Sequence, residues 1–153
     1  MLGLTLSLAV PVQAANCARP AEEAAVYVRV LQSDLMVAAL TCNARHHYNA
    51  FAKQFQPELI RHGQALKGFF NRLHGPRADE KLNAFVTYLA NDASVRSITG
   101  GGNYCQQASV VFESVLALDP AELGAFSAER LAASTPPRRI ACTGGERIVI
   151  SDE

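Results

Sequence analysis

The residues best able to do chemistry gather in one stretch of the chain, positions 43–77. All four histidines of the sequence lie there, with six Lys or Arg residues and a single acid, Glu58, so this stretch has a net charge of +5 in a chain of zero net charge. A cationic surface of this kind suits an anionic partner, such as a phosphate, a lipid headgroup or an acidic protein. The candidate binding face consists of Arg45, Lys53, Arg61, Lys67 and Arg72.

A second interpretation of these basic residues needs no partner. They alternate with an apolar stripe, as on an amphipathic helix, so they can equally be the solvated side of that helix. Acids elsewhere in the chain then balance their charge, among them Glu113, Asp119, Glu122 and Glu129. We favour this simpler interpretation and keep the cationic face as a hypothesis.

His62 differs from the other basic residues of this stretch, because it lies within the apolar stripe of the helix rather than opposite it. An inward histidine of a helical bundle can bind a metal or haem, but the known iron and manganese sites of bundles need several glutamates and a Glu-x-x-His pair, which the sequence lacks. His46 and His47 are adjacent, so on a helix their side chains diverge by about 100° and do not share one ion easily. The stripe consists of Phe51, Phe55, Leu59, His62, Leu66, Phe69 and Leu73.

Buried polar groups are normally satisfied by a nearby partner. We therefore expect His62 to be a buried core histidine. Its partner should lie on the antiparallel helix beside it, at Tyr88, Asn91 or Asp92. The alternative is a metal or small ligand held near His62.

Recognisable catalytic motifs are absent from the sequence. It contains no G-x-S-x-G, no H-E-x-x-H and no close carboxylate pair in apolar surroundings. The glycine-rich segment 99–103 precedes a helix, but no strand leads into it and no Lys-Ser/Thr follows it, so we interpret it as a linker rather than a phosphate loop. We expect neither an enzyme nor a cofactor.

Length and composition favour one folded domain. Of the 153 residues, 49% are hydrophobic and 18% are charged. This is enough apolar material for a core and too little charge for a disordered tail. The balanced charge also argues against nucleic acid as a partner, since nucleic-acid-binding domains are strongly basic.

The first residues indicate export. Positions 2–12 form an apolar run, and Val12-Gln13-Ala14 matches the small-x-small cleavage pattern. We assign 1–14 to a signal peptide and 15–153 to a single helical domain. The run is too short to cross a membrane, which takes about 20 residues, so we expect no transmembrane segment. The predicted location is periplasmic or secreted.

Four cysteines agree with that location, because an even number of cysteines in an exported chain forms disulfides. No two of them are spaced C-x-x-C, which removes the usual signature of thioredoxin chemistry and of a zinc knuckle. Spacing alone leaves three possible pairings of Cys17, Cys42, Cys105 and Cys142.

Apolar residues recur with helical spacing along the rest of the chain, and Gly and Pro mark the breaks. Pro57 removes one backbone hydrogen bond, so the second helix should kink or restart near Gln56. The first helix is apolar on nearly all sides, which indicates either the central helix of a monomer or an oligomer interface. The predicted helices span 20–42, 45–74, 79–96, 104–118 and 120–133, followed by a tail over 134–153.

These lengths predict an all-α fold, an up-down four-helix-bundle-like domain with a short fifth helix and an irregular C-terminal tail. In this topology the end of the first helix and the start of the fourth lie together, so Cys42 should pair with Cys105. Cys17 and Cys142 flank the helices and can meet at the opposite end. We therefore predict disulfides Cys42–Cys105 and Cys17–Cys142.

Two parts of the chain resemble an uncharacterised family of small exported bacterial helical proteins. The resemblance lies in 48–51 (Tyr-Asn-Ala-Phe) through 57–59 (Pro-Glu-Leu), and in 83–87 (Asn-Ala-Phe-Val-Thr) with 89–91 (Leu-Ala-Asn). It implies an exported helical domain and brings no activity with it.

Together these features predict an exported, disulfide-stapled helical module that binds or supports an envelope or secreted partner, without catalysis. The partner would be another protein or an envelope component, met by the cationic face or by the apolar first helix, through which the chain could also form a homo-oligomer. The alternative is a helical carrier of a metal or small ligand near His62.

Overall fold

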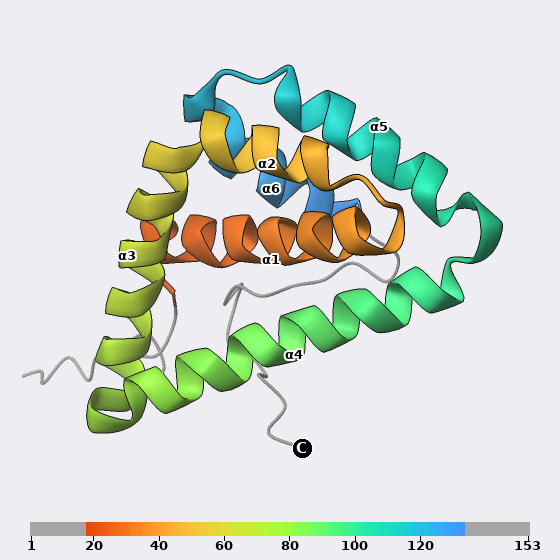
Figure 1. The fold of residues 1–153 in the computed structure, drawn as a ribbon. Helices are drawn as coiled ribbons and strands as arrows, with labels where there is room; N and C mark the ends of the chain where they lie inside the picture. The colour runs from red at the N-terminus through yellow and green to blue at the C-terminus, as the bar shows by residue number, and fades with distance from the viewer. Residues whose placement is uncertain (1–17, 134–153) are drawn as a thin grey trace, which may run out of the picture.

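Helices make up nearly all of the computed structural model, which describes residues 18–133. Three short 3-10 turns, Gly75–Arg77, Gly101–Asn103 and Pro120–Glu122, lie between helices. No strand occurs in residues 18–133, and the predicted all-α, bundle-like fold is confirmed. The predicted signal peptide and C-terminal tail lie outside this range. The helices are α1 (Pro20–Thr41), α2 (Arg45–Gln54), α3 (Gln56–His74), α4 (Ala78–Thr99), α5 (Tyr104–Leu116) and α6 (Leu123–Ala132) (Figure 1).

Helix α1 is the central element. Its buried residues lie on several sides of the helix, and α3, α4 and α6 all pack along it (Figure 1). Most of the apolar surface of α1 is therefore covered within the chain itself, with Val37 only 7% exposed, whereas Leu40 is 58% exposed. By length and composition α1 could also cross a bilayer, but more than half of its most apolar window is buried in the fold. Both observations describe a core helix.

Pro57 divides the predicted second helix. Helix α2 ends at Gln54 and α3 begins at Gln56, so the expected restart is confirmed. Pro57 has no N–H to donate, and it stands in the first turn of α3, where no donor is needed. The two helices then point in different directions, with α3 running across α1 (Figure 1).

The core has two parts, and both include residues of α1. One contains Phe51 and Phe55 of α2 with Phe112 of α5. The other contains Phe69 and Phe70 of α3 with Phe85 of α4. Helix α1 contributes Val28, Leu31 and Leu35 to the first part, and Ala25, Val26 and Val30 to the second.

Two ion pairs fix the outer helices to α1. Arg72 of α3 forms a bidentate pair with Glu22, which is 8% exposed. The same carboxylate accepts a hydrogen bond from the backbone N–H of Arg19 at 2.7 Å, just before α1 begins. Arg96 of α4 donates to Asp34 at 2.7 Å. Guanidinium–carboxylate pairs of this geometry orient the helices as well as attracting them.

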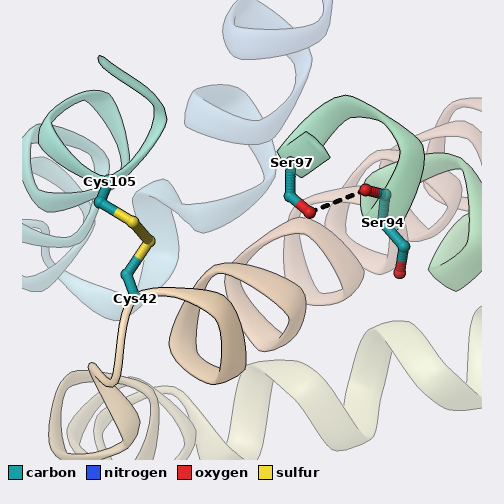
Figure 2. Close-up of a disulfide and its surroundings, with 4 residues drawn as sticks. All are labelled: Cys42, Ser94, Ser97 and Cys105. Atoms are coloured by element: carbon teal, nitrogen blue, oxygen red, sulfur yellow. Dashed lines mark hydrogen bonds between the residues drawn. A yellow bond between two sulfur atoms is a disulfide. The ribbon is translucent and has the colours of Figure 1, made fainter. Parts of the chain in front are cut away.

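A disulfide joins Cys42, directly after α1, to Cys105 in the first turn of α5. Figure 2 shows this bond and, apart from it in the same view, the C-terminal part of α4, where the Ser97 hydroxyl donates to the Ser94 carbonyl at 2.7 Å. The predicted pairing Cys42–Cys105 is confirmed. The pair Cys17–Cys142 lies outside the described residues. The segment predicted as a linker is a tight turn, with Gly101 in the left-handed conformation at φ +60°.

Candidate functional site

A groove of about 490 Å³ opens between α1, α3 and α4. Apolar side chains form most of its walls, among them Val28 of α1, Leu59 and Leu66 of α3, and Val86 of α4. The end of α2 closes one side through Ala52. After the break at Pro57, α3 turns away from α2 and contacts both α1 and α4, and the groove lies where these three helices meet.

Arg29 is the charged residue of the groove. It stands in the middle of α1, is partly buried, and donates through one terminal nitrogen to Gln32 Oε1 at 2.9 Å. Its Nε is buried and has no acceptor among residues 18–133. Burial lowers the pKa of this guanidinium, and Tyr48 opposes part of that shift. Unlike Glu22 and Asp34 of the same helix, Arg29 has no ion pair in the described residues.

His62 of α3 is 3% exposed, which confirms that it is buried. Its Nε2 lies 3.1 Å from a terminal nitrogen of Arg61. Arginine can only donate, so Nε2 must accept, and in a neutral ring the proton is then assigned to Nδ1. Burial first, and then Arg61, lower the pKa of His62, although Glu58 opposes them, so the ring is neutral at pH 7. The resulting Nδ1–H has no acceptor within residues 18–133.

The expected hydrogen-bond partner of His62 on α4 was wrong. Tyr88 is 45% exposed, and Asp92 accepts from Arg96 on its own helix. His62 instead lies beside α6, where an added Cβ on Gly124 would stand 3.7 Å from its Cε1. The expectation treated α3 and α4 as simple antiparallel neighbours and did not anticipate that α6 would pack against α1 beside this histidine.

The cationic face predicted over 45–72 is not one surface. Arg72 turns inward to Glu22, with only 23% of its side chain exposed, because this pair fixes α3 to α1. Arg61 pairs with Glu58 on its own helix, and Lys67 lies 4.0 Å from Asp79. The two remaining members, Arg45 and Lys53, are exposed on α2, whereas the other three are on α3. The break at Pro57 separates the two groups.

The other histidines pack against aromatic rings. His47 stacks on Phe112 with ring centroids 5.4 Å apart, and His74 lies 5.7 Å from Phe70. The rings of His46 and His47 are tilted against each other. Within residues 18–133 no three His, Cys, Asp or Glu side chains are grouped so that they could hold a metal ion. The described residues therefore offer no ligand set for the metal form of the carrier hypothesis.

Arg29 was not among the candidate residues predicted from the sequence, which lay in the histidine-rich stretch 43–77. A signal was present, since no acid stands three or four residues before or after it. Charged residues in the middle of an apolar helix normally have such a partner or reach solvent.

No family model, curated protein or solved structure matches this chain.

Proposed function

We propose that this chain is an exported, disulfide-stapled helical binding protein without catalytic activity, and that it carries a small ligand in the groove between α1, α3 and α4. The observation that supports this is that Arg29 and His62 both line one apolar groove, and that Arg29 Nε and His62 Nδ1 are buried and have no hydrogen-bond partner in residues 18–133. A buried donor without an acceptor costs about 1–3 kcal/mol, and a ligand oxygen would remove that cost.

The size and lining of the groove support a small ligand over an extended partner. Small-molecule sites are clefts of roughly 300–1,000 Å³ with apolar walls and a few placed polar groups. The part of the groove lining that residues 18–133 supply contains no Ser, Thr, Cys, Asp or Glu. It therefore offers His62 no nucleophile to activate, which supports binding rather than catalysis.

Export is supported by the disulfide Cys42–Cys105, because such bonds persist mainly in oxidising compartments. The apolar run and cleavage pattern before residue 15, and the resemblance to an exported bacterial family, agree with this proposal.

Native mass spectrometry under non-reducing conditions tests the proposed function directly. The chain is purified from the envelope fraction of its own host, where we expect a mass that lacks residues 1–14 and four hydrogens and includes a bound ligand. An uncleaved, reduced chain would overturn the proposed export.

Two glycines of α3 supply a matched pair of variants. Neither has an atom within 4 Å of an added Cβ, but only Gly63 lines the groove. Gly63→Leu should fill the groove and remove the bound mass, while Gly68→Leu should keep it. Both changes favour the helix, so neither should unfold the chain. Equal ligand content in the two variants, or no ligand on the wild type, would contradict the proposal.

A second candidate function, binding of another protein, is favoured by the outer face of α4. Tyr88, Val95 and Ile98 are spaced seven and three residues apart, so they share one side of the helix, and Ile98 is 80% exposed. Isolated exposed apolar residues are ordinary, but a row of them indicates a contact surface. Sedimentation of wild type and Ile98→Glu tests self-association, and identical monomers would remove a second copy of the chain as the partner.

A further inference from the structure

The two groups in the groove that lack a partner are both hydrogen-bond donors. Arg29 offers its buried Nε–H, and His62 offers Nδ1–H because Arg61 holds Nε2 as an acceptor. Neither group can be satisfied by an ammonium or by another pure donor. Arg29 and His62 both line the groove, so a ligand that suits it would carry acceptor oxygens rather than donors on that side.

The charges around the groove also indicate the charge of the ligand. Arg29 is a partly buried cation, and no carboxylate is among the groups that influence its pKa. Among residues 18–133 no Asp or Glu lines the groove, and the carboxylate of Glu58, which lies 3.8 Å from His62 Nε2, is paired with Arg61. A charge withdrawn from water is stabilised by an opposite charge close to it, which residues 18–133 do not provide. The missing partner is thus an anion.

The apolar walls of the groove indicate what the part of the ligand outside its headgroup should be. Val28, Leu59, Leu66 and Val86 present apolar surface, which a fully polar anion such as free phosphate would leave uncovered. We infer that the groove takes a single-chain amphiphile whose anionic oxygen headgroup is bound by Arg29 and His62 and whose alkyl chain lies along the apolar walls. This inference rests on the proposed carrier function and specifies its ligand class.

Four probes with the same ten-carbon chain separate the headgroup from the chain: decanoate, decyl phosphate, 1-decanol and decyltrimethylammonium. Calorimetric titration at pH 7 uses the mature, disulfide-bonded protein and probe concentrations below micelle formation. We expect both anions to bind, and 1-decanol and the cation to bind at least about tenfold more weakly, because a charge-assisted hydrogen bond contributes about that factor or more. The order of decanoate and decyl phosphate then identifies the preferred headgroup.

Three single-residue variants test where the anionic headgroup binds. Arg29→Met removes the charge and keeps an apolar stem, so decanoate affinity should fall about 10- to 100-fold while 1-decanol affinity stays unchanged. His62→Phe keeps a buried ring but loses Nδ1–H, and it should weaken decanoate in the same direction. Arg45→Met removes an equal charge from exposed α2, outside the groove, and should change nothing.

The outcomes separate this inference from the proposed function. If none of the four probes binds the wild type, the inferred ligand class is wrong, and the native mass measurement decides separately whether the chain carries another small ligand. If 1-decanol or the cation binds as tightly as decanoate, or if Arg29→Met leaves decanoate affinity unchanged, the groove binds apolar chains without selecting an anion, and the inferred ligand class is wrong.

Discussion

The disulfide Cys42–Cys105 should contribute a large share of the stability of this chain. Its two cysteines are separated by 63 positions, so the bond closes a long loop that contains α2, α3 and α4. In the chain-entropy treatment, a loop of this length restricts the unfolded ensemble by about 4 kcal/mol at 25 °C. Proteins of this size have total unfolding free energies of only about 5–15 kcal/mol.

The perturbation is the double variant Cys42→Ser and Cys105→Ser, which removes the bond without leaving one thiol free to exchange. Cys105 is exposed and Cys42 only partly buried, so the serines should cost little in packing. Urea unfolding of both proteins, followed by circular dichroism without reductant, gives the difference. With a slope of about 2 kcal/mol per M, the midpoint should fall by about 2 M.

Two results would refute this reasoning. A loss of less than about 1 kcal/mol would show that loop closure is not the main source of stabilisation. A changed native spectrum in the double variant would show that the bond holds the folded helices in place instead of acting on the unfolded chain. Reduction with a thiol reagent is a poorer experiment, because it reduces every disulfide of the chain together.

Three further predictions test other parts of the structure. Val37→Asp should unfold the chain, because it puts a carboxylate into the core at a cost of several kcal/mol. Leu40→Asp, at a 58% exposed position of the same helix, should leave the chain folded. A helical circular dichroism spectrum of Val37→Asp would show that this side of α1 is not part of the core. Ligand-free Arg29→Met should be as stable as the wild type or up to about 3 kcal/mol more stable, because it removes a partly buried charge without an ion pair in residues 18–133. A thermal melt with a clearly lower melting temperature would show that Arg29 stabilises the fold. Stability should fall on acidification in two stages, and unfolding curves between pH 8 and 3 measure both. The pKa of His62 is lowered in the folded chain, so the unfolded chain binds more protons below about pH 6.5 and the free energy of unfolding falls there. Arg72 lowers the pKa of Glu22, so the free energy of unfolding falls again below about pH 4.5. A constant free energy of unfolding between pH 6.5 and 5 would contradict the burial of His62.

Local chemistry explains why the helices could be predicted from the sequence. Proline in a first turn marks the starts of α1 and α3, and the break at Pro57 follows from a missing N–H. The pairing of Cys42 with Cys105 followed from topology, because helix ends that must meet were already defined by helix lengths. These features depend on neighbours within a few residues or on the order of the helices.

The candidate site depends on long-range packing, and for that reason the sequence revealed only part of it. His62 was recognised from its place in an apolar stripe, but its surroundings include Gly124 of α6, whose position no periodicity specifies. Arg72 has the spacing of a solvent-facing residue and yet turns toward Glu22, fifty residues earlier. The sequence shows that no acid stands one helical turn from Arg29, but its place in a groove can be seen only once α3 and α4 are in position around it.

The covalent ring closed by Cys42 and Cys105 has a consequence for how the chain responds to proteases. The exposed turn Gly101–Asn103 lies inside the ring, as do the end of α2 and the turn before α4. Exposed turns are where proteases cut first. One cut at any of these points would open the ring and leave both fragments in a single molecule. Their reassociation stays unimolecular and independent of dilution, so a nicked chain can keep its fold and its groove where an uncrosslinked bundle would lose a fragment.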